Sequence, residues 1–130
     1  MKSSSPDACP CGLGPPYGAC CGRFIAGGLA APTAEALMRS RYTAYVREDA
    51  DYLLATWHLS TRPSTLTFDP PAPRWLGLDM RSHAQADAVN ASVEFVARYR
   101  LAGRAHRLHE RSRFVHEAGR WYYLDGQMPA

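Results

Sequence analysis

Apolar and polar residues alternate along the second half of the chain, which is the pattern of half-buried β-strands. A first strand is expected at residues 75–82, where apolar residues alternate with small or polar ones. From Val89 onward, the alternation predicts three strands joined by tight turns at Ala102-Gly103 and Ala118-Gly119. These strands are expected to form an antiparallel meander.

Treating each turn as a two-residue hairpin loop fixes which residues face one another across the strands. Across the first hairpin the expected pairs are Val93–Ser112, Phe95–Glu110 and Tyr99–His106. Across the second hairpin they are Phe114–Tyr123, Ser112–Asp125 and Glu110–Gln127. One face of this sheet is apolar and must be covered, and it holds Val93, Phe95, Ala97, Tyr99, Leu108, Phe114, Trp121 and Tyr123. The opposite face is rich in arginine, and it holds Glu94, Arg98, Arg100, Arg107, His109, Arg111 and Arg113.

Two helices are expected before the strands. The first begins after Thr33, a favourable N-cap. Its apolar stripe consists of Leu37, Met38, Tyr42 and Tyr45. The second is expected at about residues 49–58, and the proline-rich residues 63–73 then form an irregular connection to the sheet. Helices that cover one face of an antiparallel sheet define an α+β fold.

Arg41 lies in the middle of the first helix's apolar stripe, where arginine is rarely buried without a partner. Either its guanidinium reaches the rim of the helix, or it points into a cavity and pairs with a carboxylate. The covered face of the sheet also carries Glu110, Ser112 and Asp125, and such polar groups need partners once they are buried. The cluster is then either a structural ion-pair network or the wall of a ligand pocket. In the second case Arg41, Glu110, Ser112 and Asp125 are the predicted ligand-binding residues.

Length and charge set outer bounds on what the chain can be. A chain of 130 residues suits a single core, and a net charge of +3 is well below that of a nucleic-acid-binding tail. The N-terminus has no apolar stretch like that of a signal peptide, and no later stretch approaches a membrane span. We therefore expect a cytoplasmic protein without membrane contact.

The four cysteines are crowded into one short segment, at Cys9, Cys11, Cys20 and Cys21, in the spacing C-x-C-x8-C-C. Thiols this close favour a shared metal ion, and Zn²⁺ is the usual occupant of an all-thiolate site. Disulfides and a redox role are the alternatives. One disulfide pairing would bridge the neighbours Cys20 and Cys21 through a strained ring, and a cytoplasmic chain keeps its thiols reduced. Metal binding is therefore the favoured interpretation.

Several segments of the chain resemble a known family. CPCGLGPPYGACCG resembles the SEC-C motif, a short zinc-binding knuckle best known from the C-terminal tail of the SecA translocation ATPase. APTAEALMRSRYTAYVREDADYLLATWH and LHERSRFVHEAGRWYYLDG are similar to bacterial YchJ-like proteins. Two features depart from the SEC-C pattern: Leu13 replaces the usual serine, and Pro15, Pro16 and Gly18 stand where lysines usually follow. If partner binding depends on that basic segment, this copy should bind weakly.

The resemblance carries expectations about metal, domains and shape. It implies Zn²⁺ bound by Cys9, Cys11, Cys20 and Cys21 within a knuckle at residues 1–28. It also implies that residues 29–130 fold like nuclear transport factor 2, with helices wrapping a curved antiparallel sheet into a cone with a cavity.

Three functional hypotheses follow. Because no convincing catalytic set is visible, the favoured one is a non-enzymatic zinc-binding accessory protein that contacts another protein through its knuckle. The second is a small-molecule binder, or a lyase- or isomerase-type enzyme, that uses the cone cavity with an acidic residue as base. The third is RNA or ribosome binding through the arginine-rich sheet face, which would be sensitive to salt.

Overall fold

The structure, a computed structural model, describes residues 8–128. Short helical segments and one longer helix precede a four-stranded antiparallel sheet, which confirms the predicted α+β class. The elements are η1 (Tyr17–Ala19), α1 (Gly22–Ile25), α2 (Ala34–Val46), α3 (Ala50–Ala55), β1 (Arg74–Gln85), β2 (Asn90–Leu101), β3 (Arg104–Glu117) and β4 (Arg120–Gln127). The predicted domain bounds of 1–28 and 29–130 stay a prediction. Residues 1–7 and residues 129–130 lie outside the described residues. The expectation that the N-terminus is not a signal peptide falls partly on residues 1–7.

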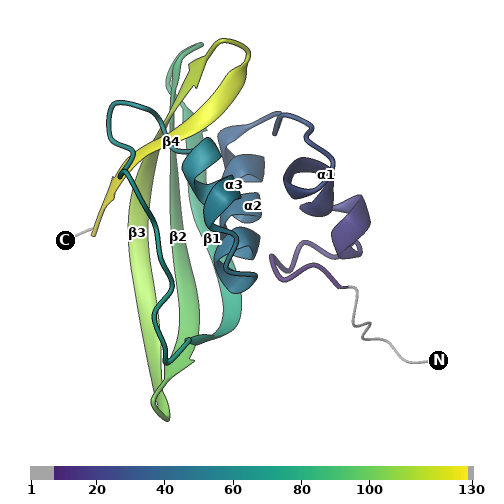
Figure 1. Cartoon of the computed structure of the whole chain (residues 1–130). Helices are drawn as coiled ribbons and strands as arrows, with labels where there is room; N and C mark the ends of the chain where they lie inside the picture. Colours follow the sequence, from purple (N-terminus) through teal and green to yellow (C-terminus); the bar gives the residue numbers. More distant parts are fainter. Residues whose placement is uncertain (1–7, 129–130) are drawn as a thin grey trace.

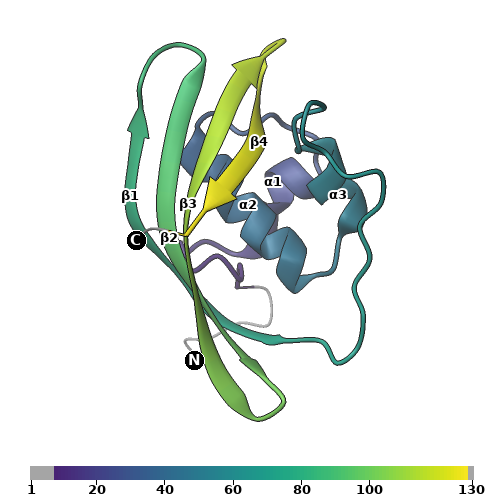
Figure 2. The same cartoon turned by 90° about the vertical axis from the view of Figure 1, so that its left-hand side faces the viewer.

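The molecule is built in layers, with α2 and α3 on one face of the sheet and the segment containing α1 beyond α2 (Figure 1). The strands follow one another in the order β1-β2-β3-β4 and curve around the helices (Figure 2). Helix α2 begins as predicted, because the Thr33 side chain accepts a hydrogen bond from the Ala36 amide at 3.0 Å. The buried core between the layers includes Leu37, Val93, Phe95 and Phe114.

The first hairpin has the predicted register. Val93 pairs with Ser112, Phe95 with Glu110, and Tyr99 with His106. Both predicted turns are present, and their alanine and glycine all have positive φ: 53° and 79° at Ala102 and Gly103, and 52° and 81° at Ala118 and Gly119. Two consecutive positive φ angles are typical of the type I′ turn, whose twist matches that of the flanking strands.

The second hairpin departs from the prediction. Phe114 pairs with Tyr123 as expected, but an irregularity between Arg113 and Phe114 shifts the register beyond it. Ser112 therefore faces Gly126 and Arg111 faces Gln127, while Asp125 lies opposite Arg113. The predicted pairs Ser112–Asp125 and Glu110–Gln127 are wrong, because one added residue in a strand sends the following side chains to the other face.

The second helix is shorter than predicted. Helix α3 ends at Ala55, because the chain that follows pairs with the edge of β4. The His58 amide donates to the Tyr123 carbonyl at 2.7 Å, and the Tyr123 amide donates to the Thr56 carbonyl at 2.8 Å. Within residues 8–128, no helix is both long enough and apolar enough to cross a membrane.

Candidate metal centre and inner cavity

The four cysteines meet at a single point. Their Sγ atoms all lie within 4.8 Å of one another, and each residue is at most 7 % exposed. All four thiols are free, and the Sγ atoms of Cys11 and Cys20 are 3.6 Å apart. A tetrahedral ion with metal–sulfur bonds of about 2.3 Å places its ligands about 3.8 Å apart. The cluster can therefore hold one metal ion with small adjustments of the side chains.

Two local structures bring the sulfurs together. Cys9 and Cys11 lie in a tight loop, in which the Gly12 amide donates to the Cys9 carbonyl at 3.2 Å and Gly12 has a φ of 79°. Cys20 and Cys21 immediately precede α1, and the Phe24 amide donates to the Cys21 carbonyl at 3.0 Å. A turn followed by a short helix thus presents one pair of thiols to the other pair.

The close approach changes the acidity of the thiols. A hydrogen bond with the Cys21 thiol lowers the pKa of Cys11 to about 5, against the opposing effect of burial. The same hydrogen bond raises the pKa of Cys21, and burial raises the pKa of Cys20 to about 11. The Cys11 thiolate is therefore stabilised by the Cys21 thiol, while the raised pKa values of Cys20 and Cys21 favour their protonated forms. A bound divalent cation would take the place of those protons.

The cysteine segment is fastened to α2. The Cys9 sulfur lies 3.6 Å from the buried Thr43 hydroxyl, and Arg39 donates to the Cys11 carbonyl at 3.1 Å. The Arg47 guanidinium lies 4.2 Å from the centre of the Tyr17 ring. The cysteines consequently belong to the same buried cluster as the residues between α2 and the sheet.

On its other side, α2 covers an inner cavity of about 240 Å³. Its walls are mainly aromatic and aliphatic, and its polar groups gather around Arg41 and Glu110. The lining residues are Met38, Arg41, Tyr42, Tyr45, Trp75, Phe95, Ala97, Leu108, Glu110, Ser112 and Tyr123. The cavity lies between α2 and the sheet, where the resemblance implies the interior of the cone.

Arg41 is buried, with only 2 % of its surface exposed, so its guanidinium does not reach the rim. It also forms no ion pair with a carboxylate of residues 8–128. Instead, its Nη1 donates to the Leu53 carbonyl at 2.8 Å and to the Thr56 hydroxyl at 2.7 Å. The rings of Trp57 and Tyr123 lie 5.1 and 4.5 Å from its central carbon. Burial lowers the pKa of Arg41, and the two rings and two oxygens offset that cost.

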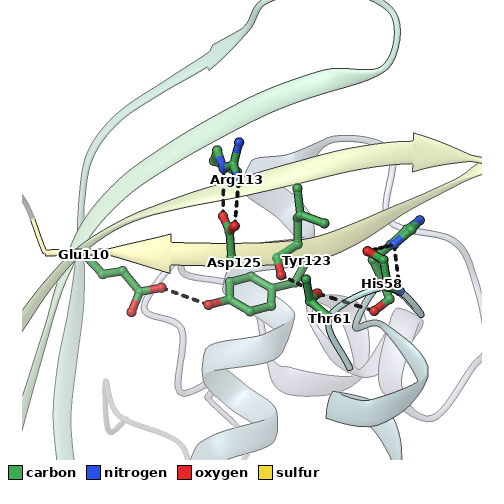
Figure 3. A network of polar contacts seen from close by, with 8 residues as sticks. His58, Thr61, Glu110, Arg113, Tyr123 and Asp125 are labelled. Atoms are coloured by element: carbon green, nitrogen blue, oxygen red, sulfur yellow. Dashed lines mark hydrogen bonds and ion pairs between the residues drawn. The ribbon is translucent and has the colours of Figure 1, made fainter. Parts of the chain in front are cut away.

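Glu110 forms the acidic part of the cavity. Its Oε2 accepts from the Ser112 hydroxyl at 2.7 Å. The same oxygen accepts from the Tyr123 hydroxyl at 3.3 Å (Figure 3). Burial raises the pKa of Tyr123, which keeps its hydroxyl protonated as a donor. Gly126 lies directly beside this carboxylate, since a Cβ there would come within 2.5 Å of the Glu110 Cδ.

Asp125 does not join the cavity. The register shift turns its carboxylate to the outer face, where it forms an ion pair with Arg113 whose Nε donates at 2.7 Å (Figure 3). Three of the four predicted ligand-binding residues therefore line one cavity and the fourth does not. Sequence reasoning missed the role of Tyr123, although its place on the apolar face and its hydroxyl group were visible.

The arginine-rich outer face is partly neutralised. Glu94 binds both His109, at 2.7 Å, and Arg111, at 3.1 Å, and Asp125 binds Arg113. Arg98 lies opposite Arg107 across β2 and β3. This arrangement leaves fewer free cations than the sequence pattern indicated, and nucleic-acid binding there stays a prediction.

Comparison with known proteins gives a consistent result. The family model described as "YchJ, middle NTF2-like domain" matches residues 33–126. A UPF0225 protein of Methylibium petroleiphilum is 58 % identical over 124 residues, covering 95 % of this chain and 90 % of the relative. One from Polaromonas naphthalenivorans is 64 % identical over 111 residues, covering 85 % and 81 %.

Two solved structures resemble the whole fold. The solution structure of a SEC-C motif containing protein from Rhodopseudomonas palustris has a TM-score of 0.82 and 35 % identity, covering 94 % of this chain and 98 % of that one. The crystal structure of a SEC-C motif containing protein from Psychrobacter arcticus has a TM-score of 0.74 and 28 % identity, covering 94 % and 82 %. The family model, the relatives and both structures point to the same family. The chain belongs to the YchJ-like family, and the relatives named above are UPF0225 proteins.

Proposed function

We propose that this chain is a zinc-binding accessory protein whose cysteine segment contacts another protein. The observation that carries the proposal is the convergence of four buried sulfurs within 4.8 Å, in a segment with little other core of its own. Zn²⁺ is the ion of choice for four thiolates, and its role here is to hold the cysteine loop and α1 in shape against α2.

The metal is tested by elemental analysis of protein purified without chelators. We expect one zinc per chain, and substitution of cobalt should give the absorption bands of tetrahedral thiolate coordination. Cys20→Ser should bind metal much more weakly. Protein that folds with no stoichiometric metal would contradict this part of the proposal.

A protein contact is supported by the surface around the cysteines. Leu13 is 54 % exposed and Leu29 is 60 % exposed. Leu29 also borders an open groove of about 510 Å³ between α1, α3 and β4, with Asp49 and Asp51 among its lining residues. Arg120 also lines the groove, so the charge of the groove is mixed, with two acidic residues and one basic residue among those that line it. Two exposed leucines, one of them at the groove, suit a partner segment that carries apolar side chains and a basic side chain for Asp49 and Asp51.

This contact is tested by cross-linking the protein to its neighbours in cells, followed by mass spectrometry. Leu13→Ser and Leu29→Ser leave all four cysteines in place, so the metal content should be unchanged while cross-links to the partner are lost. Met128→Ser is the matched control, because Met128 is 67 % exposed and follows β4. Cross-links that survive both leucine variants would rule out this surface.

A second candidate function is favoured by the inner cavity. A volume of about 240 Å³, aromatic walls and a buried guanidinium are features of a small-molecule site. Binding of any small aromatic probe inside the cavity, detected by changes in the amide resonances of α2 and β2, tests this function. If no such probe binds, the cavity is a structural void.

A further inference from the structure

The polar end of the inner cavity combines one cation and one anion in a fixed arrangement. Tyr123 connects them, because its ring lies 4.5 Å from the Arg41 guanidinium carbon and its hydroxyl donates to Glu110 at 3.3 Å. Arg41 comes from α2 and Glu110 from β3, so the two charges are held by different layers of the fold. The pair presents a donor and an acceptor to the same small volume.

Part of the Arg41 guanidinium has no hydrogen-bond acceptor among the described residues. Within residues 8–128, its hydrogen bonds all come from Nη1, to Leu53 and Thr56, which leaves Nε and Nη2 without an acceptor there. The rings of Trp57 and Tyr123 lie close to the guanidinium carbon, so a ligand acceptor is expected at the edge of the group. An acceptor atom inside the cavity could bind these N–H groups, which belong to a side chain that is 2 % exposed.

The Glu110 carboxylate can accept a further hydrogen bond. Its Oε2 accepts both protein hydrogen bonds, from Ser112 and Tyr123, while Oε1 has no donor among the described residues. A ligand carboxylate would be repelled by this group, and a ligand cation would be repelled by Arg41. A neutral group that both accepts and donates fits the two charges together.

We propose that the cavity binds a small, neutral, planar molecule of the amide type, a ring bearing a carbonyl group beside an N–H group. The carbonyl accepts from Arg41, the N–H donates to Glu110, and the ring packs among Tyr42, Trp75 and Phe95. A cavity of 150 Å³ holds benzene, so about 240 Å³ admits roughly ten non-hydrogen atoms. The inference rests on the second candidate function above and defines its ligand class.

Four probes that share one ring test the class: benzamide, benzoate, benzylammonium and toluene. Each is titrated into the full-length, metal-loaded chain, and its affinity is measured from the amide resonances of α2 and β2. Benzamide should bind about tenfold more tightly than each of the others, since it alone pairs with both charges of the cavity and is repelled by neither. If none of the four binds, cavity binding itself fails. If toluene or benzoate matches benzamide, the cavity binds ligands but the amide class is wrong.

Substitutions of the residues that line the cavity locate the binding site. Ala97→Leu fills the cavity from β2 and should abolish benzamide binding, and Leu108→Phe fills it from β3 if the first variant does not fold. Glu110→Gln removes the repulsion, so benzoate should gain about tenfold while benzamide retains its acceptor. Asp125→Asn, on the outer face, is the control and should leave all affinities unchanged. Benzamide binding that survives a folded cavity-filling variant, or a Glu110→Gln variant in which benzoate gains nothing, would overturn the proposal.

Discussion

The cysteine segment and the helix-covered sheet differ in what stabilises their folded structure. The cysteine segment, residues 8–28, contains only a three-residue 3-10 turn and a four-residue helix, and its buried apolar residues other than the cysteines reduce to Phe24. The sheet region instead buries large side chains contributed by both layers, including Leu37, Leu53, Val93 and Phe114. The cysteine segment buries too little apolar surface to offset the conformational entropy that it loses on folding, whereas the sheet region buries enough.

The difference implies two sources of stability in one chain. In the sheet region, the stabilising term is apolar area removed from water. In the cysteine segment, it is expected to be metal–thiolate bonding, which is also folding free energy wherever the site does not exist before folding. The two regions nevertheless share a boundary at α2, through Thr43 and Arg39, so each can be perturbed while the other is observed.

Removal of the metal should produce the largest difference in stability between the cysteine segment and the sheet region. Structural zinc contributes about 10–16 kcal/mol in small zinc-finger peptides, far more than the apolar contacts of residues 8–28 can replace. A strong chelator should therefore abolish hydrogen-exchange protection of amides around the cysteines, such as those of Phe24 and Ile25, while β2 and β3 stay protected. Zinc added back should restore protection. Uniform loss of protection across the whole chain would show that the two regions are not separable.

Phe114→Ala should act on the other region. Phe114 is 1 % exposed, and truncation of such a core residue costs about 3–5 kcal/mol of unfolding free energy. Denaturant unfolding measures the loss, and zinc content of the folded variant should stay at one per chain. Phe68→Ala, at a half-buried ring beside Tyr45, is the control with a smaller loss. A Phe114→Ala variant that folds but has lost its metal would contradict the view that the two regions have separate sources of stability.

Gly126→Ala probes the polar end of the cavity within the sheet region. The added Cβ would lie 2.5 Å from the Glu110 Cδ, so the carboxylate must leave the position in which it accepts from Ser112, which is fully buried. A buried hydroxyl left without its acceptor costs about 1–3 kcal/mol. Gly18→Ala is the matched control, because no atom lies within 4 Å of its Cβ position. Equal unfolding free energies for the two variants would show that the Glu110 carboxylate moves without cost.

The sequence predicted the sheet better than it predicted the inner polar cluster. Alternation of apolar residues and the two alanine-glycine turns were sufficient for the first hairpin, because its register depends on local turn geometry. Asp125 was misplaced because the irregularity beside Arg113 leaves no signal in the alternation pattern.

Arg41 shows a second limit of the sequence. Its position in the apolar stripe correctly placed it on the buried side of α2, but its partners come from α3, the chain after it and β4. Those contacts depend on how far α3 extends, and α3 stops where pairing with β4 begins. Tertiary structure, rather than helix periodicity, therefore decides that Arg41 meets carbonyl, hydroxyl and aromatic groups instead of a carboxylate.

The smallest effect is expected at the outer-face ion pair that the register shift creates. The hydrogen bond from Arg113 lowers the pKa of Asp125 below its usual value. A carboxylate with a lowered folded-state pKa contributes stability above its unfolded pKa of about 3.9, and the contribution is lost as pH falls through the folded value. Near pH 7, Asp125→Asn should lower the thermal midpoint by no more than about 2 °C, because the side chains of Arg113 and Asp125 are 62 % and 43 % exposed to solvent. The difference should vanish once the pH lies below the folded-state pKa of Asp125, and Arg113→Gln should reproduce it. A difference that persists after the carboxylate is protonated would mean that Asp125 acts through something other than its charge.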